Sequence, residues 1–87
     1  SDMSVKELVE AAGEGDVATV ERLAAAGVEL DGQRIADGRS ALHEAAARGH
    51  APVVALLIRL GAPLEARDDN MLTPLLHAAA AGHLPIL

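Results

Sequence analysis

The sequence predicts an all-α fold built from repeats, and three observations lead to this prediction. The chain has 87 residues, of which 51% are apolar, although it contains no Phe, Trp or Tyr. Ala, with 19 residues, and Leu, with 13, supply most of this apolar content, and both favour helices. Apolar residues and glycines also recur about every 33 residues. A core without aromatic rings requires helices that approach one another closely.

The repeat becomes visible when the sequence is compared with itself. At a shift of 33 residues, the segment 37–54 matches the segment 70–87 at apolar, Gly, His and Pro positions. At a shift of 34 residues, the segment 8–31 matches the segment 42–65. We therefore expect a single domain over residues 1–87, with one unit at about 4–36, a second at about 37–69 and a partial third at about 70–87.

The first unit carries signals for two helices. Ser4 and Glu7 have the S-x-x-E spacing of a capping box, which predicts that the first helix begins after Ser4. Asp16 is the expected N-cap of the second helix, because its carboxylate can accept from free backbone N–H groups. Gly27 is expected to end that helix, since Gly takes the left-handed backbone of a helix terminus without strain.

The second unit repeats this arrangement after a turn at 37–38. Ser40 is the expected N-cap of a short helix that Gly49 ends. Pro52 suits the first turn of the next helix, where its missing N–H has no consequence. The run 53–60 is apolar on nearly every side, so this second helix must be covered on both flanks.

The third unit begins like the second and departs from it at two positions. Thr73-Pro74 predicts an N-cap followed by Pro at the first helical position, in a helix that runs to Gly82. Residues 84–87 are expected to begin a further helix. Met71 occupies the place of Gly38, which puts the left-handed backbone of that turn in question, and Leu76 occupies the place of His43.

These residues resemble the ankyrin repeat signature. The resemblance rests on the segment 40–46 (SALHEAA), on Gly49-His50, on Gly61-Ala62 and on the TPL of residues 73–75, and it extends over essentially the whole chain. It implies a solenoid of stacked helix-turn-helix units with short β-hairpin-like loops. It also implies a protein without intrinsic chemistry that binds other proteins through its loop tips and the exposed face of the first helices.

Composition excludes several other classes. The formal net charge is −6 and no run of Lys or Arg occurs, so a nucleic-acid partner is not expected. No apolar stretch is long enough for a transmembrane helix, and the N-terminal residues 1–4 are polar and acidic, unlike a signal peptide. These features, with the lack of Cys, favour an intracellular protein in the cytoplasm, with the nucleus as an alternative.

The sequence does not predict an enzyme, a cofactor or a metal site. The four His residues have neither Cys partners nor the i, i+4 spacing of a helical metal site. We expect His43 to close the N-cap, and His50 and His83 to bridge backbone groups between units. Ser40 is expected to be a helix cap rather than a nucleophile. Asp68 and Asp69 are expected to lie in a solvated turn.

The expected partner-binding residues lie on the loops and on the exposed positions of the first helices. These positions serve neither the backbone nor the core in the sequence pattern, and Arg is a favoured interface residue because it pairs bidentately with carboxylates. The alternative is a solvated face without a partner. The predicted set is Arg34, Asp37, Arg39, Ala47, Arg48, Arg67, Asp69, Asn70 and Leu72, with Ala36, Ala80 and Ala81 beside it.

A second expectation concerns the last unit, whose apolar side chains have no following unit to cover them. Exposed apolar patches of this kind mark association sites or unstable ends. Three interpretations stay open: a fragment of a longer protein, a homodimer through the C-terminal end, or an engineered minimal scaffold. The residues expected in self-association are Leu75, Leu76, Leu84, Ile86 and Leu87.

Overall fold

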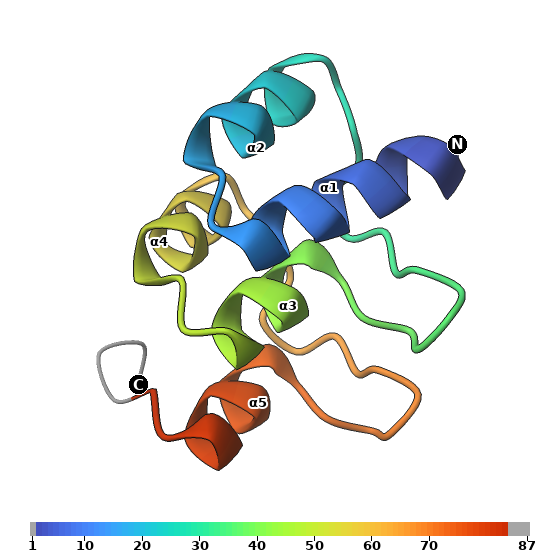
Figure 1. The fold of residues 1–87 in the computed structure, drawn as a ribbon. Coiled ribbons are helices and arrows are strands. Elements are labelled where there is room, and N and C mark those ends of the chain that lie inside the picture. Colours follow the sequence, from blue (N-terminus) through green and yellow to red (C-terminus); the bar gives the residue numbers. More distant parts are fainter. Residues whose placement is uncertain (1, 84–87) are drawn as a thin grey trace.

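The computed structural model describes residues 2–83 as a stack of helix pairs (Figure 1). The helices of this part are α1 (Asp2–Glu14), α2 (Val17–Ala25), α3 (Ala41–Ala47), α4 (Ala51–Arg59) and α5 (Pro74–Ala81). Helices α1, α3 and α5 pack side by side in one layer, and α2 packs on α4 in a second layer. Two long loops project from one side of this stack: finger 1, residues 28–40, and finger 2, residues 62–73. The predicted all-α repeat solenoid is confirmed.

The helix ends follow the predicted caps, with one exception. The Asp16 carboxylate accepts from the Thr19 N–H, and Ser40 Oγ accepts from the His43 N–H in a reciprocal capping box. The capping box predicted at Ser4 is wrong, because α1 already begins at Asp2 and an N-cap must have a non-helical backbone. No Gly or Pro precedes Ser4, so nothing in the sequence stops the helix from extending by a further half turn.

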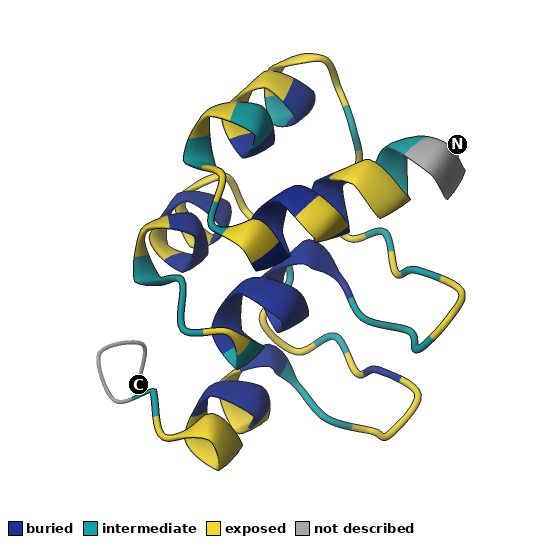
Figure 2. Cartoon of the chain, in the orientation of Figure 1, coloured by how far each residue is buried: buried dark blue, intermediate teal, exposed yellow. Residues whose placement is uncertain are grey.

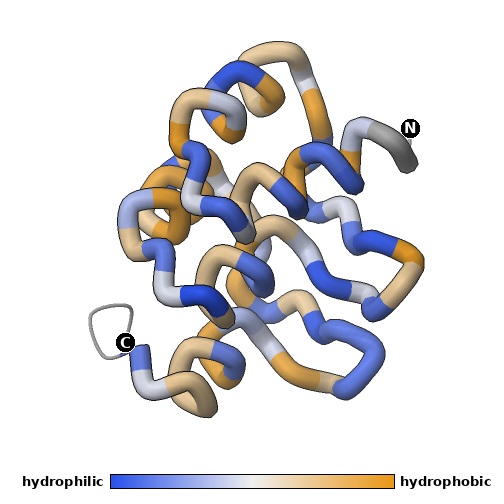
Figure 3. Tube along the Cα trace, in the orientation of Figure 1, coloured by the Kyte–Doolittle hydropathy of each residue, from blue (hydrophilic) through white to orange (hydrophobic). Residues whose placement is uncertain are grey.

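The core is built from Ala, Leu and Val between the two layers. Leu8, Leu42 and Leu57 are at most 2% exposed, and Val20 and Val53 are fully buried. Figure 2 shows that the buried residues gather on the facing sides of the helices, while the outer turns and loops stay exposed. Figure 3 shows that hydrophobic residues gather along the helices and also occur on the projecting loops. The small Ala side chains of α3 let α1 and α5 approach it closely, which explains a core without aromatic rings.

Two histidines link successive units, as the sequence predicts. His50 Nε2 donates to the Gly13 carbonyl at 2.8 Å, and His83 Nε2 donates to the Ala47 carbonyl at 3.0 Å. Each bond satisfies a carbonyl near the end of a first helix, where no intrahelical donor is available.

The helix expected from residue 84 onward lies outside the described residues. Among the described helices, none is long and apolar enough to cross a membrane.

The finger turns keep a left-handed backbone even where Gly is replaced. Gly38 has φ 73°, and a Cβ there would lie 2.8 Å from the Asp69 backbone N, so finger 2 packs directly on this Gly. Met71 has φ 64° although it carries a side chain, which is 62% exposed. The turn geometry that the sequence put in question is therefore retained, at the cost of local strain.

Replacing Met71 by Gly should raise the free energy of unfolding by about 0.5–1 kcal/mol. Relief of the left-handed strain, about 1–2 kcal/mol, is partly offset by the greater unfolded-state freedom of Gly. Gly38→Ala is the matched control and should destabilise, because its Cβ meets the neighbouring finger. Urea unfolding followed by circular dichroism measures both, and a stability loss in Met71→Gly would contradict the strain argument.

Candidate functional site

The two fingers form one continuous unit held by backbone bonds. In finger 1, the Arg34 N–H donates to the Arg39 carbonyl at 2.9 Å and the Gly38 N–H donates to the Arg34 carbonyl at 2.8 Å. Finger 2 joins it where the Asp69 N–H donates to the Asp37 carbonyl at 2.9 Å. These hairpin-like bonds position the finger tips together, so residues far apart in the sequence share one face.

Gln33 adds a second link between the fingers. Its Nε2 donates to the Gly38 carbonyl at 2.7 Å and to the Arg67 carbonyl at 2.6 Å. A single amide thus bridges both loops, which limits their independent movement. The face they form is therefore largely preformed.

The buried carboxylate of Glu44 pairs with three of the arginines near the predicted partner-binding surface, which we call the arginine face. Glu44 lies on α3 with its side chain 2% exposed, and it pairs with Arg39, with Arg34 at 3.2 Å and with Arg48 at 3.3 Å. Arg34 is also bidentate to Asp37, through Nε at 2.8 Å and Nη2 at 2.7 Å. Three guanidinium groups therefore converge on one carboxylate. We call these four residues, Arg34, Arg39, Glu44 and Arg48, the Glu44 cluster.

The Glu44 cluster corrects part of the sequence interpretation. Arg34, Asp37 and Arg39 were expected to serve neither backbone nor core, yet they hold finger 1 against α3. The pKa of Asp37 is held at about 2, mainly by the hydrogen bonds from the Arg34 guanidinium. The hydrogen bond from the Arg39 N–H lowers this pKa further. Asp37 is therefore ionised at neutral pH, and Arg34 and Arg39 are engaged with carboxylates of the same chain.

Asp68 corrects a second expectation, because it is buried rather than solvated. Its side chain is 1% exposed and receives hydrogen bonds from the Asn70 N–H at 2.9 Å, the Leu72 N–H at 3.0 Å and His77 Nε2 at 2.6 Å. Burial alone would raise the pKa of Asp68, but the hydrogen bonds from His77, Leu72 and Asn70 outweigh it and hold the pKa at about 2. Asp68 is therefore the anchor that shapes finger 2.

Two histidines fasten the base of finger 2 to the helices. His43 Nδ1 accepts from the Ser40 N–H at 3.1 Å, so its Nε2 carries the proton that it donates to the Leu72 carbonyl at 2.8 Å. The His77 ring stands edge-on to His43, with ring centroids 5.6 Å apart. Desolvation lowers the pKa of His43, against the hydrogen bond to Leu72, so this ring is held neutral. His43 thus closes the N-cap as predicted.

The predicted partner-binding residues divide into structural and exposed groups. Arg34, Asp37 and Arg39 are half-buried within the fingers, and Ala47 and Leu72 are also half-buried. Arg48, Arg67, Asp69 and Asn70 are exposed, and of these Arg48 keeps 60% of its side chain accessible while it pairs with Glu44. The flanking Ala36, Ala80 and Ala81 are exposed as well.

The predicted self-association residues lie at the edge of the stack. Leu75 is 55% exposed and Leu76 is 48% exposed, and both border a groove of about 370 Å³ between α4 and α5. Ile58 and Leu64 line the same groove. Leu84, Ile86 and Leu87 lie outside the described residues.

Sequence reasoning missed an exposed apolar side chain at the tip of each finger. Ile35 is 81% exposed on finger 1 and Met71 is 62% exposed on finger 2. The signal available in the sequence was that Ile35 stands in a polar turn and that Met71 replaces a Gly. Both side chains extend the candidate face beyond the predicted set.

Comparison with known proteins agrees with this architecture. The family model described as ankyrin repeats, in three copies, matches residues 8–87. The chain is 38% identical over 72 residues to SH3 and multiple ankyrin repeat domains protein 1 of Homo sapiens, and to the proteins of the same name from Mus musculus and Rattus norvegicus. The match covers 83% of this chain but only 3% of each relative's length. The chain belongs to the ankyrin repeat family.

Proposed function

We propose that this chain binds a protein or peptide partner through its finger tips and the exposed face of α1, α3 and α5, without catalysing a reaction. Ankyrin repeats are in general protein–protein interaction modules, and they are typically non-catalytic. The observation that supports this face most directly is the exposure of Ile35 and Met71 at the tips of two fingers that backbone bonds hold together. Exposed apolar side chains on a preformed face favour association, because little order is lost on binding.

Further parts of this proposal follow the sequence analysis. The proposed repeat units are residues 4–36, 37–69 and 70–87. The proposed location is intracellular, which is common among ankyrin repeat proteins. The exposed members of the predicted set, Arg48, Arg67, Asp69 and Asn70, are the side chains that a partner can reach without unfolding the fingers.

Binding is expected to depend on Arg48 and Arg67 and not on arginines of the second layer. Peptides selected from a random library displayed on phage should lose about tenfold in affinity when both residues become Ala, since Arg contributes strongly at interfaces. The pair suits the test because Arg67 forms no ion pair among the described residues and Arg48 is largely exposed. Isothermal titration calorimetry with the selected peptides gives the affinities.

The matched control replaces Arg22 of α2 and Arg59 of α4 by Ala, because both are exposed in the other layer. Equal losses in the two double variants would count against the proposed face. Failure to select any binding peptide would count against the binding function itself.

A second candidate function is self-association through the edge at α5, supported by the groove that Leu75, Leu76, Ile58 and Leu64 line. Sedimentation velocity of the wild-type chain should then show a dimer, and Leu75→Lys with Leu76→Lys should abolish it, because two charges would be buried in an apolar contact. Ile35→Lys, at an exposed apolar residue elsewhere, is the control and should leave the dimer intact. A monomer at all concentrations rejects this candidate.

A further inference from the structure

Finger 1 contains both Asp-Gly pairs of the chain, Asp31-Gly32 near its start and Asp37-Gly38 at its tip. An Asp-Gly pair is prone to rearrange, because Gly has no Cβ to keep its backbone N away from the carboxyl group of the preceding Asp. The reaction requires a carboxyl group that is free to turn and a backbone N–H that is free to leave its surroundings. The contacts of each pair therefore decide whether it reacts.

Both reacting groups of Asp37-Gly38 are held in place. The Asp37 carboxylate receives hydrogen bonds from the Arg34 guanidinium at 2.8 Å and 2.7 Å, and from the Arg39 N–H at 3.1 Å. The Gly38 N–H donates to the Arg34 carbonyl at 2.8 Å. The pKa of Asp37, about 2, also keeps its carboxyl ionised, and a carboxylate resists attack by a nucleophile. These contacts must break before the Gly38 N can reach the Asp37 Cγ.

The Asp31-Gly32 pair lacks these restraints. Asp31 is exposed in a turn, and its carboxylate accepts no hydrogen bond and forms no ion pair within the described residues 2–83. The Gly32 N–H donates to no backbone carbonyl in the same range. The Asp31 carboxyl is therefore free to turn toward the Gly32 N, and water reaches both.

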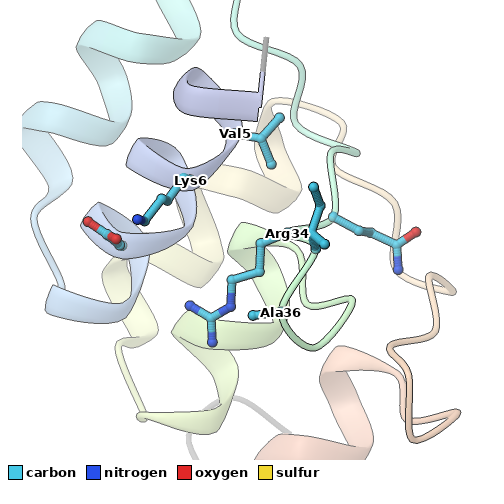
Figure 4. Close-up of a pocket in the computed structure, with 7 residues that line it drawn as sticks. Val5, Lys6, Arg34 and Ala36 are labelled. Atoms are coloured by element: carbon cyan, nitrogen blue, oxygen red, sulfur yellow. The ribbon is translucent and has the colours of Figure 1, made fainter.

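Gly32 also lies where finger 1 contacts α1. A Cβ at this position would lie 2.6 Å from Val5 Cγ2, so the backbone of Gly32 packs directly on Val5. Figure 4 shows Val5 of α1 directed toward finger 1. A longer main chain beside Gly32 would displace the finger from α1, because this contact leaves no space for another atom.

We propose that Asp31 is a site of spontaneous isomerisation to isoaspartate, which displaces finger 1 from α1, and that the fold protects Asp37 from the same reaction. The Gly32 N bonds to the Asp31 Cγ, and the N–H hydrogen leaves with the carboxyl OH as water, which forms a five-membered succinimide. Solvent water then cleaves the bond between this N and the main-chain carbonyl C. The main chain now runs through Cβ and Cγ, one atom longer, and the carboxylate is attached to Cα. This inference is independent of the proposed function, since it requires no partner.

The test compares the two pairs within one sample of the full chain, aged at physiological temperature and neutral pH. Trypsin separates the pairs, because cleavage after each Arg places Asp31 in the peptide 23–34 and Asp37 in the peptide 35–39. Methylation by an isoaspartate-specific carboxyl methyltransferase and fragment-ion mass spectrometry measure the isoaspartate in each peptide. It should accumulate about tenfold faster in 23–34, because hydrogen bonds to a charged group must break before Asp37 reacts. Equal rates, or a faster rate in 35–39, would overturn the proposal.

Ageing in concentrated urea separates the effect of the fold from that of the sequence. Unfolding removes the hydrogen bonds of Asp37, so the two peptides should then accumulate isoaspartate at similar rates. A tenfold difference that persists in urea would show that neighbouring residues alone select Asp31, and it would overturn the protection assigned to the fold.

Asp31→Glu is the matched control for the displacement of finger 1. It keeps the charge at an exposed position, and its longer side chain does not form the five-membered ring. Aged wild-type chain should show a second set of NMR signals for the Val5 methyl groups, in proportion to its isoaspartate content, whereas the aged variant should not. A single set of signals in isomerised chain would overturn the displacement.

Discussion

Replacing Asp68 by Ala is expected to lower the free energy of unfolding by about 3 kcal/mol, the largest effect among the polar residues considered. The change removes the acceptor for the Asn70 N–H, the Leu72 N–H and His77 Nε2. Each buried donor left without a partner costs about 1–3 kcal/mol, and Asn70 is exposed enough to regain water. Finger 2 would lose its shape as well as its stability, which urea unfolding and amide hydrogen exchange at Leu72 would report.

Asp69→Ala is the matched control for this prediction. Asp69 is the adjacent carboxylate, it is exposed, and its side chain accepts no hydrogen bond from the described residues, so its loss should change stability by less than about 0.5 kcal/mol. Similar losses in the two variants would show that Asp68 acts only through its charge and not as the anchor of finger 2.

The pH dependence of Asp68→Ala gives a separate test. Because the pKa of Asp68 is held at about 2, below its ordinary value of 3.8, its stabilisation is complete above about pH 4. That stabilisation is lost as the pH falls from about 4 to about 2. The stability of the wild-type chain should therefore fall toward that of Asp68→Ala over this range. Parallel curves would contradict the assignment.

His43 should add a second, higher step. Its pKa is lowered by burial, so the unfolded chain binds more protons below pH 6.5 and the stability falls as the pH drops below this value. Asp68→Ala should keep the step below pH 6.5 and reduce the one below pH 4 to the part that Asp37, whose pKa is also about 2, contributes, which separates His43 from Asp68.

Replacing Glu44 by Gln is expected to cost about 2 kcal/mol, which corresponds to a fall in Tm of about 8–16 °C for a domain of this size. Hydrogen bonds to charged groups contribute about 1.5–3 kcal/mol, and the partners Arg34, Arg39 and Arg48 are between 24% and 60% exposed, so water replaces part of what they lose. The amide keeps the shape of the side chain but not its charge. Thermal unfolding and hydrogen exchange at Gly38, whose N–H closes finger 1, measure the effect.

Glu14→Gln is the matched control for Glu44→Gln. This substitution makes the same chemical change on the exposed side of α1, where Glu14 forms no ion pair with a described residue. The Tm of this variant should therefore stay within about 2 °C of the wild type. A Glu44→Gln variant as stable as this control would show that the three guanidinium groups gain nothing from the buried carboxylate.

The same cluster changes how the arginine face should be probed. One possible probe is the double variant Arg39→Ala with Arg48→Ala. Because Arg39 pairs with the buried Glu44, that double variant would lower stability as well as binding. Arg48 with Arg67 separates the two effects better, since Arg67 is exposed and Arg48 is mostly accessible.

The sequence predicted the elements that depend on neighbours along the chain. Asp16, Ser40 and Thr73 cap their helices, because a capping side chain needs only a backbone N–H two or three residues away. Gly49 and Gly82 end α3 and α5 with φ of 76° and 75°, since a left-handed terminus favours Gly locally. The N-cap predicted at Ser4 is wrong because the helix begins before Ser4, and a residue inside a helix cannot cap it.

The errors concern residues whose partners lie in another element of the fold. Nothing near Asp68 in the sequence indicates that His77 reaches back from α5 to bury it. Likewise, Arg34 and Arg39 stand apart from Glu44 in the sequence, and only the packing of finger 1 on α3 brings them to it, beside Arg48 at the end of the same helix. A periodic pattern shows which residues share a face, but it does not show which charges on that face neutralise one another.

The sequence by itself determined the repeat, the all-α class, the helix caps and the aromatic-free Ala and Leu core, because these depend on backbone preference and on apolar periodicity. Only the tertiary structure decided which polar residues hold the fingers and which stay available. It placed Asp68 and Glu44 in the interior and left Glu10, Glu14 and Ile35 on the outside. The physical reason is that the energy of a charge depends on its burial and partners, and stacking of the units sets both.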